Sequence, residues 1–265
     1  MPRVTLILPS IRPDLLQDCI RRMTETAGCD DYEIVVVAPF EVRGPRIRWL
    51  PEHTRRGVIA AHAEAYASTD SEYVVAMADY LVPHRNWLKN ALSFIEERET
   101  DGRPLCAGLF LAANERGAGA CIGSVFGHYY PYFPAARRRS CEAVGGYFSP
   151  DYVAYFADPD LGLRFWANGG HCQLCWDSVL VASHKRAGIS PQQAGLTSFL
   201  GQDMARFVER WRPRFGPDWP VATMTDFNID IPAQYIAFDD MTLLPRLFRR
   251  VDRTMPDASS AQSSG

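Results

Sequence analysis

The sequence has 265 residues, of which 47% are hydrophobic and 22% charged, and its formal net charge is −3. These values are typical of a globular chain with a sizeable core and exclude a disordered or fibrous protein. The small negative charge gives no support to a nucleic-acid-binding function. The longest apolar run, near residues 105–113, is about half the ~18 residues that a membrane helix needs.

The location of the protein is predicted from its amino terminus and its cysteines. Neither a signal peptide nor a lipidation motif precedes the first apolar segment. The 7 cysteines are an odd number and are scattered along the chain, which favours reduced thiols over a disulfide framework. We therefore expect a cytoplasmic protein.

The first hundred residues alternate strand patterns with helix patterns. β-rich apolar runs predict strands over residues 4–9, 33–38, 47–50 and 73–77. Apolar residues at helical spacing predict helices over residues 14–26, 57–68 and 87–98. This alternation favours an α/β fold with a mostly parallel sheet flanked by helices.

The pattern changes after residue 103. We expect strands over 105–113, 120–126, 171–176 and 178–182, helices over 161–168 and 198–211, and a turn-rich aromatic stretch over 126–133. The last residues, 257–265, are polar and predict a disordered tail. Because no linker interrupts the chain, we expect one domain over 1–256.

Several common motifs are absent or incomplete. The glycines at 117–123 lack the spacing of a dinucleotide fingerprint, and no phosphate-binding P-loop is present. Cys172 and Cys175 have the spacing of a zinc half-site, but no second pair follows. Positions three apart in a strand face opposite sides, so we expect these two cysteines to be structural.

Three polar residues lie where chemistry is expected. Asp79 and His184 each follow a predicted strand, and Asp158 opens a predicted helix. Ligands of parallel sheets bind at the carboxyl ends of the strands. Two carboxylates and an imidazole there could hold a divalent metal and a diphosphate, and one carboxylate could act as general base. A helix cap is the competing interpretation of Asp158.

The order of the motifs resembles glycosyltransferase family 2. The strand followed by Arg12-Pro13 is similar to the opening of that family, and Asp79 lies in a segment that resembles its D-x-D region. The matching segments are 4–15, 33–37, 57–61, 73–88, 143–148, 155–164, 181–184 and 207–211. They cover about residues 3 to 215, and their order and spacing, rather than any one segment, carry the resemblance.

The resemblance implies a GT-A-like fold with a Rossmann-like nucleotide-binding half to about residue 103 and an acceptor half over about 104–240. It implies transfer of a sugar from a nucleotide-sugar to a hydroxyl of a glycan or lipid-linked acceptor, with inversion, in bacterial surface polysaccharide or glycoconjugate synthesis. Asp158 would be the catalytic base, and Asp79 and His184 the ligands of Mn²⁺ or Mg²⁺. The implied donor site comprises Pro9, Ser10, Arg12, Gly57 and Asp79. Gly146 and Asp160 are expected on the acceptor side.

Three positions depart from the family pattern. Ala38 stands where the family has an aspartate that contacts the nucleotide, only one carboxylate remains in 78–80, and Ala157 precedes Asp158 in place of glutamate. We therefore expect weak metal dependence. Arg137, Arg138 and Arg139 could stabilise a diphosphate instead, although a solvated basic loop explains them equally well. The lost carboxylates also leave open a degenerate binding module without turnover.

The segment 243–253 has leucine, phenylalanine and valine on one helical face and arginines on the rest. A basic amphipathic helix of this kind suits an anionic membrane surface. The same apolar face could instead pack on the domain. Peripheral membrane contact and packing both remain open from the sequence.

Overall fold

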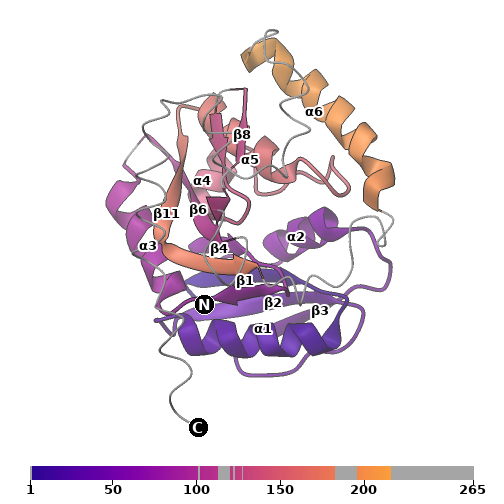
Figure 1. Cartoon of the computed structure of the whole chain (residues 1–265), viewed down its shortest axis with the longest axis vertical. Helices are drawn as coiled ribbons and strands as arrows, with labels where there is room; N and C mark the ends of the chain where they lie inside the picture. Colours follow the sequence, from indigo (N-terminus) through magenta and orange to yellow (C-terminus); the bar gives the residue numbers. More distant parts are fainter. Residues whose placement is uncertain are drawn as a thin grey trace.

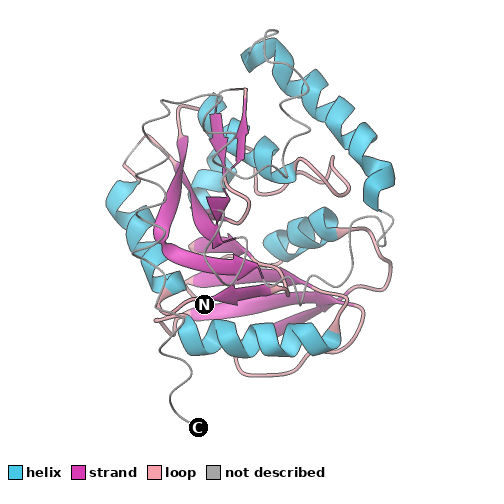
Figure 2. Ribbon diagram, viewed as in Figure 1, coloured by secondary structure: helices cyan, strands magenta, loops and turns pink. Residues whose placement is uncertain are grey.

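The computed structural model describes residues 2–100, 102–112, 120–121, 123–126, 128–182 and 196–215. Its core is a curled sheet with helices on both faces (Figures 1 and 2). The main sheet has the order β3-β2-β1-β4-β10-β6-β11-β5, with β7 paired to β6, and β8 and β9 form a separate pair. The strands are β1 (Val4–Pro9), β2 (Tyr32–Ala38), β3 (Ile47–Pro51), β4 (Tyr73–Ala76), β5 (Leu81–Pro83), β6 (Leu105–Ala112), β7 (Ala120–Cys121), β8 (Gly123–Val125), β9 (His128–Tyr130), β10 (Pro134–Arg137) and β11 (His171–Ala182).

The helices divide between the two faces. They are α1 (Pro13–Thr26), α2 (Val58–Ala67), α3 (Trp87–Arg98), α4 (Arg138–Ala143), α5 (Ala157–Ala167) and α6 (Leu200–Phe215), with a 3₁₀ turn over Leu196–Phe199. In β1, Leu6 and Leu8 face the core formed with α1 and α3, whereas Ile7 faces the core formed with α2, α4 and α5. Because both faces are covered, the central strand β4 is buried along its whole length rather than alternating between buried and exposed residues.

The α/β class and the mostly parallel sheet are confirmed. β1 pairs in parallel with both β2 and β4, and β2 pairs in parallel with β3. β6 and β11 run parallel to each other. The carboxyl ends of β1, β2, β3 and β4 therefore lie at one edge of the sheet, which is where we expected the ligand site.

Two antiparallel strands of the main sheet were not predicted. β10 lies between β4 and β6 and runs antiparallel to both, and β5 runs antiparallel to β11. The sequence of β10, Pro-Ala-Ala-Arg, contains no β-branched or aromatic residue, so its local propensity for a strand is low. Its place in the sheet is decided by the tertiary pairing.

Other boundaries also differ from the prediction. Residues 171–182 form the single strand β11, with a register shift between Cys175 and Val179, where two strands were expected. The predicted strand over 120–126 is divided between β7 and β8, and the aromatic stretch after it contains β9. Helix α5 begins at Ala157, four residues before the predicted start.

The two cysteines of the zinc-like spacing are confirmed as structural. Cys172 Sγ contacts the carbonyl of Gly162 in α5, and Cys175 Sγ contacts the carbonyl of Asn90 in α3. They point to opposite faces of β11, as the period of a strand requires. Free thiols are present at Cys19, Cys29, Cys106, Cys141, Cys172 and Cys175.

Three of the predicted features lie outside the described residues. They are His184, the amphipathic segment 243–253 and the polar tail 257–265. Within the part of the chain that is described, no helix is both long enough and apolar enough to cross a membrane.

Candidate active site

The donor edge of the sheet brings Ser10, Arg12 and Asp79 together. Ser10 follows β1, and its hydroxyl donates to Asp79 Oδ2 at 2.6 Å. Arg12 Nε donates to the same oxygen at 3.0 Å, and Arg12 Nη2 donates to Asp79 Oδ1. Asp79 is buried, with 5% of its surface exposed. The sequence predicted these residues at one site but missed their mutual contacts.

The backbone fixes both loops just where their strands end. The N–H of Ser10 donates to the carbonyl of Val37 at 3.0 Å, and the N–H of Met77 donates to the carbonyl of Ile7 at 2.9 Å. These bonds continue the parallel pairing one step beyond β1 and β4. Asp79 and Arg12 therefore meet on short, well-anchored loops.

The described residues do not fit a divalent metal. Both oxygens of Asp79 already accept hydrogen bonds, and its charge is paired with the Arg12 guanidinium. The described residues contain no group of three or more His, Cys, Asp or Glu side chains that could hold an ion. Hard cations such as Mg²⁺ need several oxygen ligands, and one neutralised carboxylate offers few.

Asp158 occupies the first turn of α5. Phe156, the residue at the N-cap, has a φ of 66° and lies in the left-handed region, so the chain turns sharply into the helix. The Asp158 side chain is partly exposed. Withdrawal from water raises the pKa of its carboxyl to about 7, while a hydrogen bond to its own backbone N–H opposes this shift. A partly exposed carboxyl with a pKa near neutrality is suited to general acid–base chemistry.

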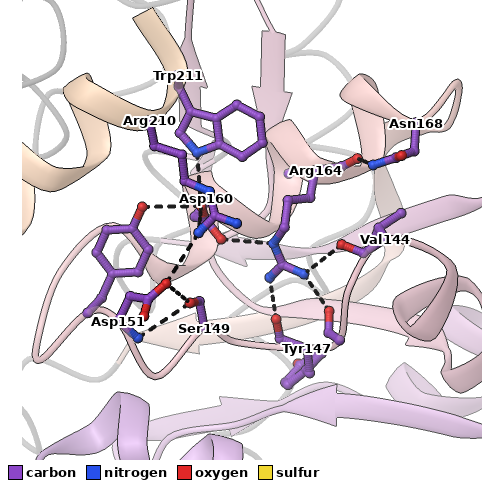
Figure 3. Close-up of polar contacts among 12 residues, drawn as sticks. Val144, Tyr147, Ser149, Asp151, Asp160, Arg164, Asn168, Arg210 and Trp211 are labelled. Carbon is purple, nitrogen blue, oxygen red and sulfur yellow. Dashed lines mark hydrogen bonds and ion pairs between the residues drawn. The ribbon is translucent and has the colours of Figure 1, made fainter. Parts of the chain in front are cut away.

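Asp160 is a structural anchor rather than an acceptor ligand. It is fully buried, and its Oδ1 accepts from Tyr152 Oη at 3.1 Å and from Trp211 Nε1 at 2.9 Å. Its Oδ2 accepts from Arg164 Nε at 2.8 Å (Figure 3). The acceptor-side role that we expected of Asp160 does not fit this burial, because no part of the carboxylate reaches the surface.

Arg164 joins α5 to the turn at Gly145 and Gly146. Its Nη1 donates to the carbonyls of Val144 and Gly146, and its Nη2 donates to the carbonyl of Tyr147. Gly146 has a φ of 103°, a conformation that only glycine adopts readily. The turn that was expected on the acceptor side is thus held rigidly against the helix that bears Asp158. A role for Gly146 in acceptor binding stays a prediction.

The three consecutive arginines lie at the wrong edge of the sheet. Arg137 pairs in register with Tyr73, the first residue of β4, whereas Asp79 follows the last residue of that strand. Arg137 and Arg139 form ion pairs with Glu99, and Arg138 donates to the carbonyls of Tyr66 and Ser71. The diphosphate role that we considered for these arginines does not fit this position, because β10 runs antiparallel to β4 and ends at the opposite edge.

Gly57 links the donor edge to the loop that precedes Asp158. It caps the start of α2 with a φ of 97°, and a Cβ built on it would lie 2.7 Å from the carbonyl oxygen of Val153. Any side chain there would push the two segments apart. The glycine therefore permits close contact between α2 and the loop over residues 149–156, which we call the approach loop.

Three buried residues of α6 that contact this region were not singled out as functional. Asp203, Phe207 and Trp211 are spaced by four residues, so they share one face of α6. Phe207 and Trp211 were predicted as apolar positions of an amphipathic helix and lie at the two ends of the matching segment 207–211, whereas Asp203 was not noted. The sequence did offer one signal: Asp203 falls on the same helical face as the apolar residues Phe207 and Trp211, which is unusual for a carboxylate.

The structure is similar to solved glycosyltransferases. A mannosyltransferase from Pyrobaculum calidifontis, solved with GDP-Man and Mn²⁺, matches 98% of this chain over 82% of its own length, with 18% identity and a TM-score of 0.61. GalNAc-T7, solved with UDP, GalNAc and Mn²⁺, matches 95% of this chain with 11% identity and a TM-score of 0.60. Residues 1–349 of S. aureus TarS match 96% of this chain over 88% of their length, with 13% identity and a TM-score of 0.53.

The chain has the GT-A fold. It spans 55% of the length of GalNAc-T7, so that enzyme contains much that this chain does not match. No family model matches the sequence, and no curated protein matches it. Within this fold Asp158 lies on α5, and Ser10, Arg12 and Asp79 lie at the carboxyl edge of the sheet.

Proposed function

We propose that this protein is a glycosyltransferase that moves a sugar from a nucleotide-sugar to a hydroxyl group, with inversion at the anomeric carbon. The observation that carries the proposal is the GT-A fold, in which Asp158 lies on the first turn of α5 at a partly exposed position, and the raised pKa of its carboxyl, about 7, supports it. The similar structures, solved with GDP-Man, UDP or GalNAc, support a nucleotide-sugar donor.

The chemistry assigned to Asp158 is proton removal. Its ionised carboxylate accepts the proton of the acceptor hydroxyl as the acceptor oxygen bonds to the anomeric carbon. The bond between that carbon and the diphosphate oxygen breaks, and the electron pair leaves with the nucleoside diphosphate. Attack from the face opposite the leaving group inverts the anomeric configuration.

Arg12 presents a guanidinium at the donor edge, where its charge is shared with Asp79. A leaving diphosphate gains negative charge in the transition state, and a fixed cation nearby stabilises it. Arg12 is fixed, because Asp79 holds two of its nitrogens and Ser10 supports Asp79. We infer that Arg12 contributes to donor binding and that divalent metal contributes little. The similar mannosyltransferase and GalNAc-T7 structures were solved with Mn²⁺. A divalent ion would supply Lewis-acid assistance to the leaving diphosphate, but the residues described here do not fit one.

The acceptor is proposed as a glycan or a lipid-linked glycan, in surface polysaccharide or glycoconjugate synthesis. This part of the proposal rests on the resemblance in sequence alone. A peripheral membrane location would depend on segment 243–253, which lies outside the described residues.

The test of the proposed function is donor hydrolysis. Purified full-length chain is incubated with UDP-, GDP-, dTDP- and CMP-sugars, and release of the nucleotide is measured. We expect one nucleotide class to be hydrolysed by the wild type and far more slowly by Asp158→Asn. Equal release by both proteins, or no release from any donor, would refute the assignment.

A binding module without turnover is the second candidate. The observation that favours it is the pairing of Asp79 with Arg12, which removes the carboxylate of the D-x-D region from metal binding. Thermal shift with nucleoside diphosphates, with and without Mn²⁺, separates the two candidates when combined with the hydrolysis assay. Stabilisation by a nucleotide without hydrolysis of any donor supports the binding module.

A further inference from the structure

Helix α6 packs one face against the part of the chain that leads into Asp158. Asp203 and Phe207 are fully buried, and Trp211 is 5% exposed. Phe207 and Trp211 belong to the same apolar cluster as Tyr152 and Phe156 of the approach loop. Figure 1 shows α6 at the rim of the molecule, beyond α5 and away from the parallel strands. The helix therefore contributes little to the sheet and much to this loop.

Asp203 binds three consecutive backbone N–H groups of the approach loop. Its Oδ2 accepts from Val153 at 3.2 Å, from Ala154 at 2.9 Å and from Tyr155 at 3.0 Å. Its Oδ1 also accepts from Val153 at 3.2 Å. Successive N–H groups that converge in this way form a concave site for an anion. A buried carboxylate is costly unless it is hydrogen-bonded, so this geometry fixes the loop backbone strongly.

The residue after this group of N–H donors is under backbone strain. Phe156 has a φ of 66°, and a residue other than glycine in this region typically costs about 1–3 kcal/mol. Its ring stacks on Phe207 of α6 with the centroids 5.1 Å apart. Contacts from α6 thus maintain a turn that the chain would otherwise relax. Asp158 is only two residues further along.

The same helix also fixes the chain on the other side of Asp158. Trp211 Nε1 donates to Asp160 Oδ1, and Arg210 forms an ion pair with the same carboxylate at 3.4 Å (Figure 3). Residues 153–156 and residue 160 are therefore both held by α6. The backbone of Asp158 lies between these two attachments.

We propose that Asp203 is a positioning residue for sugar transfer, whose carboxylate holds the approach loop so that α5 presents Asp158 to the reacting hydroxyl. This inference rests on the proposed function, because it takes Asp158 as the base. Asp203 itself is buried and acts through the loop backbone. Its loss should slow the chemical step and leave donor binding nearly unchanged.

The kinetic test compares Asp203→Ala and Asp203→Asn with a matched control, Glu209→Gln, which changes an exposed carboxylate on the same helix. Misplacement of a reacting group by about 1 Å can cost ~100-fold in rate, so we expect Asp203→Ala to lower kcat about 10–100-fold with the donor KM within twofold. Asparagine keeps one acceptor oxygen but loses the charge, so Asp203→Asn should fall between Asp203→Ala and the wild type. Glu209→Gln should match the wild type within twofold.

Hydrogen–deuterium exchange of the full-length variants gives a readout that does not need activity. We expect peptides covering 150–160 to exchange faster in Asp203→Ala, more modestly in Asp203→Asn, and at the wild-type rate in Glu209→Gln. If Asp203→Ala does not fold, the same comparison is made with Asp203→Asn, for which we expect a three- to tenfold loss of kcat.

The outcomes separate this inference from the proposed function. A folded Asp203→Ala with kcat within twofold of the wild type, or Asp203→Asn with wild-type kcat and exchange, would overturn the positioning role while leaving the transferase intact. A wild type without activity on any donor would refute the proposed function. In that case, unchanged exchange at 150–160 in Asp203→Ala would also refute the role of Asp203 in holding the loop.

Discussion

Arg12 and Asp79 form a two-point ion pair at the carboxyl ends of β1 and β4, with the Arg12 Nε 3.0 Å from Asp79 Oδ2. The pair joins the loop after β1 to the loop after β4, and its two residues are 67 positions apart in the sequence. Asp79 is the single carboxylate left in the D-x-D region, and an arginine of the same chain neutralises it. This relationship leads to two of the predictions that follow.

Arg12→Ala should destabilise the fold strongly, and the losses of stability in Arg12→Ala and Asp79→Ala should not add in the double variant. In Arg12→Ala, Asp79 remains buried without its counter-charge, a situation that typically costs about 3–5 kcal/mol. In the double variant with Asp79→Ala the charge is gone, so the two losses should not add, with a coupling free energy of about 1–3 kcal/mol. Urea unfolding of the four proteins measures it. The exposed pair Arg21–Glu25 is the control, for which we expect about 0.5 kcal/mol.

Chelation of divalent metal should change activity little. The Arg12 guanidinium already occupies both oxygens of Asp79, so a metal would have to displace it. We expect donor hydrolysis after EDTA treatment to stay within about threefold of the untreated enzyme. Complete loss that micromolar Mn²⁺ restores would show that ligands outside the described residues, with His184 the first to test, create a metal site.

Asp158→Asn should abolish turnover and leave donor affinity within a few-fold. The substitution keeps the size of the side chain and removes only the base, which is typically worth ~10²–10⁴-fold in rate. Single-turnover rates and nucleotide affinity of the two proteins provide the measurement. A variant that keeps a third or more of the wild-type rate would favour a helix-capping role for Asp158.

The rate should also depend on pH near neutrality. Burial raises the pKa of Asp158 to about 7, so the carboxylate that accepts the proton is lost as the pH falls through this value. We expect kcat to fall about tenfold per pH unit well below pH 7 and to level off above it. A profile that stays flat from pH 5 to pH 8 would contradict the assignment of Asp158 as the base.

The same pKa predicts a stability difference of a definite sign. A carboxyl whose pKa is raised by folding makes the folded state bind its proton more tightly, so wild-type stability is lost as the pH rises from the unfolded value toward about 7. Asp158→Asn removes this loss. Its melting temperature should therefore exceed that of the wild type by more at pH 8 than at pH 5. Calorimetry at the two pH values tests this, and an equal difference at both would contradict it.

Much of the fold was evident from local sequence. The strands β1, β2, β3 and β4 and the helices α1, α2 and α3 follow from apolar runs and helical spacing, because each element buries a continuous pattern in the core. The sequence also identified Asp158 and Asp79 as the residues to examine, since position after a strand or at a helix start is a local property. The contacts that set the chemical environment of these two residues could not be predicted from local sequence.

Tertiary structure decided what those residues contact. Arg12 reaches Asp79, and Asp203 reaches the approach loop, through contacts between residues 67 and about 50 positions apart, which no local pattern encodes. Strand β10 forms its backbone hydrogen bonds with β4 and β6, and it runs antiparallel to both. This direction places Arg137, Arg138 and Arg139 at the edge opposite Asp79. The burial of Asp160 also arises only when α5 and α6 pack together. The desolvation that raises the pKa of Asp158 likewise depends on neighbours in space and not on neighbours in sequence.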